Sequence, residues 1–159
     1  MERAIAELQR GFLDPAQIEA SRRSMGLDRQ LIGDRTYFLV ESGGRLAGCG
    51  GWSFRTTLYG GDHTAGLRDD TRLDPGRDPA RIRAMYTDPD FVRHGIGRLV
   101  LALCEDAART AGFTRSEMMA TLAGEPLYAA CGYRPIERVA RLAAEGPAVP
   151  GVRMGKSLV

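Results

Sequence analysis

The most informative part of this sequence reads Asp88-Pro-Asp-Phe-Val-Arg-His-Gly-Ile-Gly-Arg98. It stands between a predicted strand over 81–87 and a predicted amphipathic helix that starts at Ile96. The first backbone N–H groups of a helix have no partner inside the helix, and the helix dipole favours anions there. Gly95 and Gly97 let the backbone come close to a phosphate group and turn its amides inward. The segment is therefore suited to bind a pyrophosphate.

Two arginines support phosphate binding by this segment, and the absence of two known nucleotide motifs limits which phosphate compounds it can bind. Arg93 and Arg98 can add charge-assisted hydrogen bonds at the rim of the loop. Two glycines before a helix are a weak sign by themselves, since a tight turn without a ligand has the same sequence. A dinucleotide-binding loop would need a third glycine where Val100 stands. A Walker loop would need Gly-Lys-Ser/Thr, and the only lysine is the distant Lys156. Neither nucleotide motif fits.

Hydrophobic periodicity predicts the helix that follows the loop. We expect its buried face to be lined by Ile96, Leu99, Val100, Leu103, Cys104 and Ala107, with Glu105, Asp106 and Arg109 lying off that face. Gly112 then closes the helix, because glycine readily adopts the left-handed conformation of a helix end.

The other elements follow from apolar spacing, β-formers and turn signals. Helices are predicted over 2–10, over 15–25 after the start signal Asp14-Pro15, and over a short segment up to Ile32. Strands are predicted over 36–40, 46–54, 81–87, 116–122, 133–142 and 152–158, with a short helix over 124–131. Glycines at 48, 50 and 51 indicate a bulge or a close backbone approach. The order predicts an α/β fold, a mixed β-sheet flanked by helices, in one domain over 1–159.

Composition fits one ordinary globular domain and gives no sign of a nucleic-acid partner. The chain has 159 residues, and its 43% hydrophobic and 26% charged residues are both typical of such a domain. Lys156 is the only lysine among 22 basic residues, and the arginines are interleaved with acids, for a net charge of +2. Coding bias explains this pattern better than nucleic-acid binding, which would favour a clustered basic stripe.

Cysteine usage and the N-terminus indicate the compartment. Cys49, Cys104 and Cys131 are far apart and form no CxxC or Cys/His spacing, so neither a metal site nor a disulfide framework is expected. Early acids such as Glu2 exclude the apolar core of a signal peptide, and the longest strongly apolar run, 99–104, is too short to span a bilayer. We expect a soluble, cytoplasmic protein without a membrane partner.

Residues 81–133 resemble the core of the GCN5-related N-acetyltransferase (GNAT) superfamily in the order and spacing of their motifs. The family signature is Q/R-x-x-G-x-G/A after a strand, and its glycines are supplied here by Arg93-His-Gly-Ile-Gly-Arg98. The family's second half looks like Thr121-Leu-Ala-Gly-Glu-Pro-Leu-Tyr-Ala-Ala-Cys-Gly-Tyr133, and its last strand like Val152-Arg-Met-Gly-Lys156. The resemblance covers most of the chain from about Thr36, and the combination is specific although each part is weak.

Two features depart from the family pattern. Val92 stands at the first signature position, where the family has Gln or Arg, and Arg93 follows it. Because the loop binds mainly through backbone amides, this departure affects only one side-chain contact. The family also usually opens with a strand before its first helix, whereas Met1 almost begins a helix here. We therefore expect that the first edge strand is missing or that a neighbouring subunit completes the sheet. This fold commonly forms homodimers through its sheet or its C-terminal strands.

The resemblance implies acetyl-CoA as the cosubstrate and no metal. The loop amides that would bind its pyrophosphate are those of Arg93, His94, Gly95, Ile96, Gly97 and Arg98. Met85, Tyr86 and Thr87 would pair with the pantetheine arm, and the family splays this strand from the one over 116–122 to open a slot for the thioester. Tyr128 matches the tyrosine near the coenzyme sulfur, where a phenol can protonate the departing thiolate; plain core packing is the competing interpretation.

The general base is not evident from the sequence. Several family members carry a glutamate on the strand before the loop, but here that strand reads Arg81-Ile-Arg-Ala-Met-Tyr-Thr87. Glu117 on the next strand is the nearest carboxylate in sequence and is our catalytic candidate. The weaker candidates are Glu41, Asp90 and Glu125, and an ordered water can serve instead, since each acid taken singly is more often a solvated surface group. His63, in the long loop, could reach the substrate.

The sequence does not identify the acceptor of the acyl group. Segment 57–79 is rich in glycine, aspartate and arginine and has no periodicity, and such long loops are usually functional or mobile. Trp52, Phe54 and Tyr59 either anchor the core and this loop or help to wall the acceptor pocket. The resemblance implies an N-acetyltransferase that moves an acetyl group from acetyl-CoA to a primary amine of a small molecule or protein. The alternatives are a non-catalytic acyl-CoA-binding or sensing domain and a nucleotide-phosphate enzyme.

Overall fold

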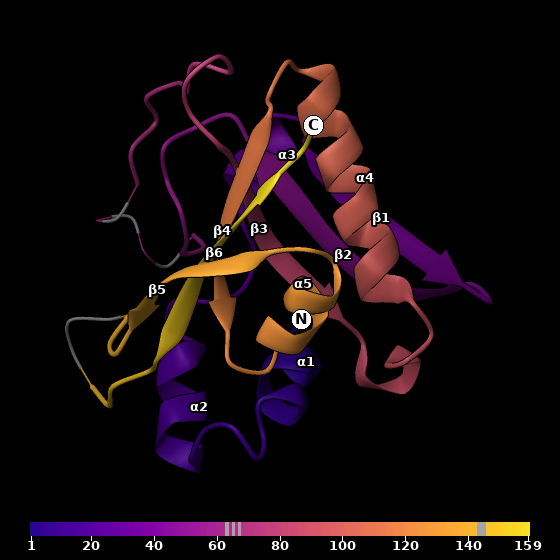
Figure 1. Ribbon diagram of the computed structural model, residues 1–159. Coiled ribbons are helices and arrows are strands. Elements are labelled where there is room, and N and C mark those ends of the chain that lie inside the picture. The colour runs from indigo at the N-terminus through magenta and orange to yellow at the C-terminus, as the bar shows by residue number, and fades with distance from the viewer. Residues whose placement is uncertain (63, 65, 67, 143–145) are drawn as a thin grey trace.

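Six strands form one mixed sheet in the order β1-β2-β3-β4-β6-β5 (Figure 1). The computed structural model describes residues 1–62, 64, 66, 68–142 and 146–159. The strands are β1 (Tyr37–Ser42), β2 (Arg45–Ser53), β3 (Ala80–Thr87), β4 (Arg115–Thr121), β5 (Arg134–Val139) and β6 (Gly151–Ser157). Only β3 and β4 pair in parallel. The predicted fold class, a mixed sheet with flanking helices, is confirmed.

Helices lie on the sheet and at one of its ends. They are α1 (Glu2–Leu8), α2 (Pro15–Ser21), α3 (Arg29–Gly33), α4 (Ile96–Thr110) and α5 (Glu125–Ala130), with the 3-10 turn η2 (Pro89–Phe91) before the glycine loop. Asp14 caps α2 as predicted, in a reciprocal capping box with Gln17. The helix predicted to reach Met25 ends at Ser21, and Ser24 Oγ donates to Ser21 O, a local bond that competes with the helical pattern.

Helix α4 packs across β1, β2 and β3 on one face of the sheet (Figure 1). Its buried side is formed by Val100, Leu101, Cys104, Glu105 and Ala108. The predicted face was therefore wrong in part, since Leu99 is 47% exposed and Leu103 is 36% exposed. Glu105, predicted to lie off the face, is 5% exposed and accepts from Lys156 Nζ at 2.8 and 2.9 Å. The ion pair with Lys156 offsets the cost of burying the Glu105 carboxylate. The hydrophobic periodicity of the helix could not predict this pair, because Lys156 is distant in the sequence.

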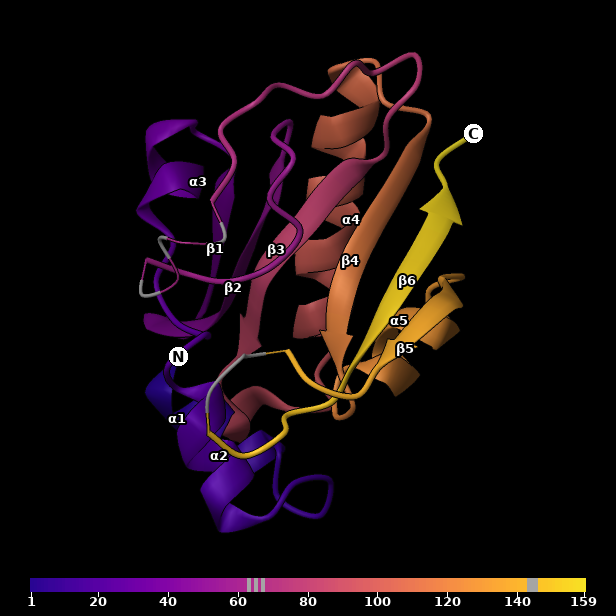
Figure 2. The ribbon, with the colours of Figure 1, turned by 90° about the vertical axis from the view of Figure 1, so that its left-hand side faces the viewer.

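Strands β3 and β4 separate soon after they begin. Their register holds only the pairs Ala80–Ser116 and Arg81–Glu117. Figure 2 shows the two strands close together at that end and apart at the other. The splay that the resemblance implied is present, and it leaves the β4-facing backbone of Met85 to Thr87 outside the ladder.

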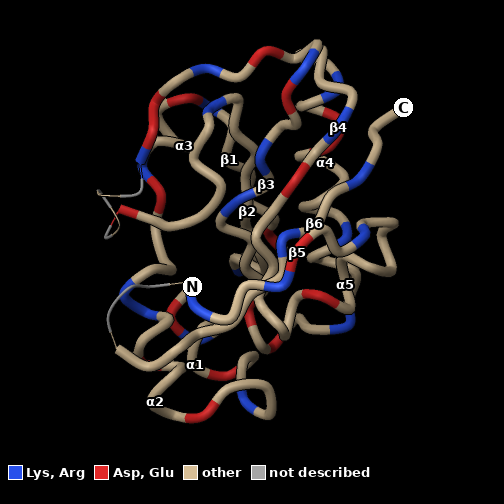
Figure 3. Tube along the Cα trace, turned by 60° about the vertical axis from the view of Figure 1, so that its left-hand side comes forward, with Lys and Arg blue, Asp and Glu red and all other residues tan. Residues whose placement is uncertain are grey.

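The sheet has β1 and β5 as its edges. Residues 1–36 contain α1, α2 and α3, and these come before the edge strand β1. Basic and acidic residues are interspersed along the trace (Figure 3). No helix within the described ranges is long and apolar enough to cross a membrane.

Candidate active site

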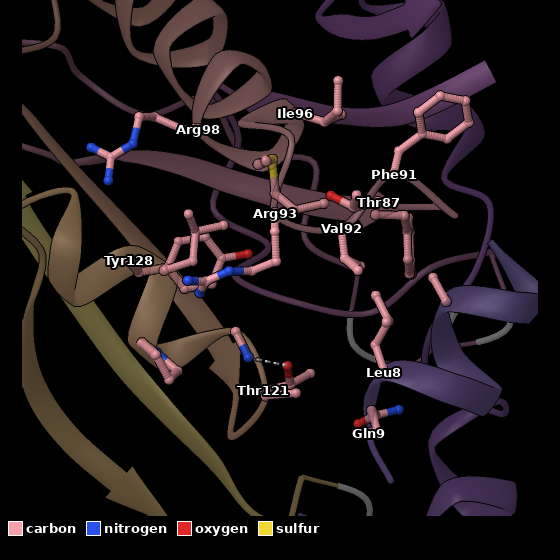
Figure 4. Close-up of a pocket in the computed structure, with 18 of the residues that line it drawn as sticks. Leu8, Gln9, Thr87, Phe91, Val92, Arg93, Ile96, Arg98, Thr121 and Tyr128 are labelled. Carbon is pink, nitrogen blue, oxygen red and sulfur yellow. Dashed lines mark hydrogen bonds between the residues drawn. The ribbon is translucent and has the colours of Figure 1, made fainter. Parts of the chain in front are cut away.

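A cavity of about 630 Å³ lies between the end of β3, the glycine loop, α5 and α1. Figure 4 shows the start of α4 and Tyr128 bordering the same space. The predicted coenzyme-binding residues that line it are Met85, Tyr86, Thr87, Arg93, Gly95, Ile96, Gly97 and Arg98. His94 does not line it, and its ring packs edge-on against Phe91 at 6.2 Å. The structure thus brings the end of β3 and the glycine loop together at one cavity.

Most amides of the glycine loop have no hydrogen-bond partner among the described residues. Gly95 caps α4 at φ +80, and Arg93 also has a positive φ of 65, so the chain turns sharply before the helix. Among the hydrogen bonds of the described chain, none is donated by the amides of Arg93 or of residues 95–98. His94 N alone donates within the loop, to Phe91 O at 3.4 Å. These donors lie at the positive end of a 15-residue helix, an arrangement that favours an anion.

Gly97 allows α5 to lie close to this helix end. A Cβ atom at Gly97 would stand 2.8 Å from Cδ2 of Leu127, closer than side chains tolerate. Leu127 precedes Tyr128 on α5. Gly97 therefore gives the end of the Leu127 side chain room beside the start of α4.

Tyr128 is held by packing on both sides of its ring. It is 8% exposed and stacks edge-on with Tyr133 at 6.2 Å. A Cβ at Gly124 would stand 2.8 Å from its Cε2 atom. No hydrogen-bond partner of its hydroxyl is found in the part of the chain that the structure describes. Burial raises the pKa of Tyr128 above its ordinary value, so the phenol keeps its proton at neutral pH.

A second, smaller cavity of about 120 Å³ adjoins the first. The two share the wall residues Met25, Met85, Tyr86, Thr121 and Tyr128. The smaller cavity is also lined by residues 58–61 of the long loop and by Arg83 of β3. Tyr128 consequently faces two spaces, which could hold two different molecules.

Tyr86 ties the wall between the cavities to the segment after α2. Its hydroxyl accepts from Gly26 N at 2.8 Å and donates to Gly26 O at 3.3 Å. Burial raises the pKa of Tyr86 to about 12, despite the opposing bond from Gly26. The side chain is therefore a neutral structural link at the start of the slot.

Glu117 is not brought to Tyr128. It lies four residues before Thr121 on β4, roughly 13 Å along a strand. Its Oε2 accepts from Arg81 Nη1 at 2.9 Å and from Arg153 Nη2 at 2.7 Å. Two arginines therefore occupy this carboxylate, and its position on β4 lies away from the slot.

The weaker acid candidates are also engaged or exposed. Asp90 pairs with Arg3 and Arg45 at 2.9 and 2.6 Å, and these two arginines hold its pKa below the ordinary value. Glu125 pairs with Arg138 at 2.7 Å. Glu41 is exposed on β1, and His63 lies outside the described residues. Nor do the described His, Cys, Asp and Glu side chains form any group of three or more suited to hold a metal ion.

Of the three aromatic candidates, two belong to the core and one lines a cavity. Trp52 is buried and meets Phe54 and Phe113 edge-on at 6.0 and 5.9 Å, so it belongs to the core. Phe54 packs against that core. Tyr59 lines the smaller cavity, and its hydroxyl donates to Leu142 O at 3.1 Å.

Helix α1 contributes a wall that sequence reasoning missed. Ile5, Leu8 and Gln9 line the large cavity. Arg3 Nη1 pairs with Asp88 at 3.2 Å and Nη2 with Asp90 at 2.9 Å, and this holds α1 against η2. The spacing of Ile5 and Leu8 marked the apolar face of α1, but local sequence does not indicate what that face covers.

The unpaired helix amides, the splayed strands and the buried tyrosine at one cavity define an acyltransferase of the coenzyme A-dependent class. Residues 2–133 match the model of the acetyltransferase (GNAT) family, and the chain belongs to this family, which uses acetyl-CoA. No curated protein sequence matches the chain.

Solved structures with the same fold agree. A GCN5-related N-acetyltransferase from Rhodopseudomonas palustris has a TM-score of 0.64 at 17% identity, over 98% of this chain and 84% of that one. An aminoglycoside 6'-N-acetyltransferase complexed with coenzyme A has a TM-score of 0.61 at 10% identity, over 99% and 91%. The yncA protein of Salmonella typhimurium, solved with acetyl-CoA, has a TM-score of 0.59 at 19% identity, over 91% and 71%. At these identities the similarity concerns the fold.

Proposed function

We propose that this protein transfers the acetyl group of acetyl-CoA to a primary amine of a small molecule or protein. One observation carries the proposal. The unpaired amides at the start of α4 and the hydroxyl-bearing face of Tyr128 border the same cavity of about 630 Å³. An anion site and a proton donor at one cavity suit a thioester substrate that has a pyrophosphate at one end.

The chain offers binding positions for three parts of acetyl-CoA, which are the pyrophosphate, the pantetheine arm and the thioester. The amides of residues 93 and 95–98 are donors for the pyrophosphate, with Arg93 and Arg98 at the rim. Backbone groups of Met85 to Thr87 that face the splay are available to the pantetheine arm. The thioester then lies in the slot beside Tyr128, where the two cavities share their walls.

The reaction requires one bond exchange and two proton movements. The neutral amine attacks the thioester carbonyl carbon, the C–S bond breaks, and the amine nitrogen loses one proton after the C–N bond has formed. Tyr128 Oη, which stays protonated at neutral pH because burial raises its pKa, donates a proton to the departing sulfur. Glu117 has no role in this proposal, because Arg81 and Arg153 hold it away from the slot. The amine proton leaves to an ordered water.

Thiol release from acetyl-CoA, measured over a panel of amines, tests the proposal. The expected result is release that depends on both the enzyme and an amine. A thermal melt with acyl-CoAs and nucleotides gives a second readout, because a ligand at a hundredfold excess over its Kd stabilises the folded state by about 2.7 kcal/mol. Stabilisation by acetyl-CoA without turnover on any amine would favour a non-catalytic acyl-CoA-binding domain. Stabilisation by ATP instead would contradict the coenzyme site.

A further inference from the structure

One side chain in the wall of the large cavity has an unused hydrogen-bond acceptor. Gln9, at the C-terminal end of α1, is 4% exposed and lines this cavity together with Ile5 and Leu8. Within the described ranges, no group donates to its Oε1 atom. Oε1 is also not among the polar atoms that are sealed off without a partner, so it is open to the cavity. A nearly buried amide oxygen usually has a donor, and one that faces a cavity calls for a donor on a ligand.

The surroundings of Gln9 fix which end of its amide faces the cavity. Nε2 donates to Ser21 Oγ at 3.0 Å and to Ile5 O at 3.3 Å. The Ser21 hydroxyl uses its own proton to donate to Ile18 O at 2.7 Å, so toward Gln9 it can only accept. Ile5 O can only accept as well, so a flipped amide would place Oε1 against two acceptors. Nε2 therefore points to Ser21, and Figure 4 shows the side-chain oxygen on the side of the cavity.

The two cavities offer an incoming amine no carboxylate. No aspartate or glutamate of the described chain lines either of them. Arg93 and Arg98 line the large cavity, but a guanidinium has no acceptor. The hydroxyls of Thr87 and Thr121 can both donate and accept, whereas the amide oxygen of Gln9 can only accept. This oxygen suits the N–H of a neutral amine, because it carries no formal charge that would hold the amine as an ammonium ion.

The position of Gln9 relates it to the acceptor and not to the coenzyme. In Figure 4, Gln9 and Arg98 lie on opposite sides of the cavity, so Gln9 is far from the start of α4. Its Nε2 lies 3.7 Å from Met25 Sδ. Met25 is a wall residue of both cavities, as is Tyr128. Gln9 is therefore beside the place where the cavities adjoin, from which a second molecule can approach the thioester.

We propose that Gln9 binds the acceptor amine, and that its Oε1 accepts a hydrogen bond from one N–H of this amine. The inference rests on the proposed function, because an amine is the reacting group there. One N–H can bond to Oε1 while the nitrogen lone pair points to the thioester carbon. As the C–N bond forms, the nitrogen becomes positively charged and the same hydrogen bond becomes charge-assisted. The bond is then stronger in the transition state than in the bound state, which raises the rate.

Gln9→Met tests the proposal, because methionine keeps the length of the side chain and removes the acceptor. The substrate is the amine with the fastest thiol release from acetyl-CoA among methylamine, butylamine, benzylamine and lysine. Its kcat/KM should fall by about tenfold or more, the loss expected for a hydrogen bond to a charged group. The Kd for acetyl-CoA, measured by calorimetry, should stay within about twofold. An unchanged kcat/KM, or a fall matched by an equal rise of this Kd, would overturn the inference.

Gln17→Met is the matched control for lost stability. Gln17 on α2 donates to Ala148 O at 2.6 Å and accepts from Asp14 N at 3.0 Å, and it lines neither cavity. Both variants should have a lower Tm, but Gln17→Met should keep kcat/KM for the amine within about threefold. If Gln9→Met does not fold, Gln9→Asn, which withdraws the amide by one methylene, takes its place with the same expected loss. An equal fall of kcat/KM in the Gln9 and Gln17 variants would contradict the proposal.

A binding measurement keeps this inference separate from the proposed function. Thermal melts of wild type, Gln9→Met and Gln17→Met are run with saturating coenzyme A and each of the four amines. A rise of Tm with an amine that is lost only in Gln9→Met supports the amine site even if no amine is acetylated. A rise shared by all three proteins would overturn the inference and leave the proposed function intact. The absence of a rise with every amine in wild type would also overturn it.

Discussion

Ile96, the first residue of α4, lies directly over Gly48 of β2, and a Cβ atom at Gly48 would overlap Ile96 Cγ2. The glycine thus sets how closely the start of α4 approaches the sheet. Gly50, two residues further along β2, has a similar role, since its Cβ would stand 2.8 Å from Cγ1 of Val100. The position of the start of α4 is consequently set by the absence of side chains at two positions of β2.

Gly48→Ala should displace the start of α4 and weaken acetyl-CoA binding. Forcing a methyl group into a packed contact costs typically about 1–3 kcal/mol of stability. We expect a lower Tm and a smaller stabilisation by acetyl-CoA in the same melt. Gly33→Ala serves as the control, because nothing lies within 4 Å of a Cβ at Gly33. Equal behaviour of the two variants would show that the Gly48 contact does not position the helix.

Gly95→Ala should impair the coenzyme site beyond its cost in stability. Gly95 has φ +80, and a left-handed conformation costs other residues about 1–2 kcal/mol. Gly44→Ala is the matched control, with φ +74 in the turn between β1 and β2 and equally open space around a Cβ. Both variants should lose similar stability. The dissociation constant for acetyl-CoA, measured by calorimetry, should rise in Gly95→Ala and stay unchanged in Gly44→Ala. If it rises in neither variant, the glycine loop does not bind the coenzyme.

Tyr128→Phe should lower turnover and leave acetyl-CoA binding nearly unchanged. General acids contribute roughly 10²- to 10⁴-fold to the rate, so kcat should fall by a factor in that range. Tyr133→Phe provides the comparison, since its hydroxyl bonds to Ser116 Oγ at 2.7 Å and is a structural group. That variant should lose about 1 kcal/mol of stability and keep kcat. Full activity in Tyr128→Phe would leave core packing as the role of this residue.

Stability should decrease above pH 10 because Tyr86 stays protonated in the folded state. Its folded pKa is about 12, whereas a tyrosine in the unfolded chain titrates near 10. The unfolded state therefore releases a proton first, and the contribution that is complete below pH 10 is lost as the pH rises toward 12. From Tyr86 alone, the free energy of unfolding should be about 1.4 kcal/mol lower at pH 11 than at pH 9.

Urea unfolding of wild type and Tyr86→Phe at pH 9, 10 and 11 measures this effect. Burial also raises the pKa of Tyr128 and Tyr133, so both proteins should lose stability with pH. Tyr86→Phe should be less stable than wild type at pH 9, because it lacks the two hydrogen bonds to Gly26. Between pH 9 and 11 its free energy of unfolding should fall by less than that of wild type, and the difference should equal the contribution of Tyr86 given above. Parallel curves for the two proteins would disprove the shifted pKa of Tyr86.

Side-chain orientation on β3 shows why part of the site could not be predicted. Strands β2 and β3 change register between Cys49 and Gly51, and Ala84 has φ +50 at this bulge. A bulge interrupts the alternation of faces along a strand, so period-2 reasoning fails beyond it. The position of Arg83 at the smaller cavity therefore could not be derived from the sequence of β3.

The sequence by itself determined the features that depend on neighbouring residues. The glycine loop and the start of α4, the capping of α2 by Asp14, the order of strands and helices and the position of Tyr128 after Gly124 all follow from local conformational preferences. Only the tertiary structure decided which side chains meet. Glu105 is buried because Lys156 reaches it, and Glu117 is held by Arg81 and Arg153 instead of entering the slot. Such pairs join residues that are 36 to 51 positions apart, and no local pattern encodes a contact over that separation.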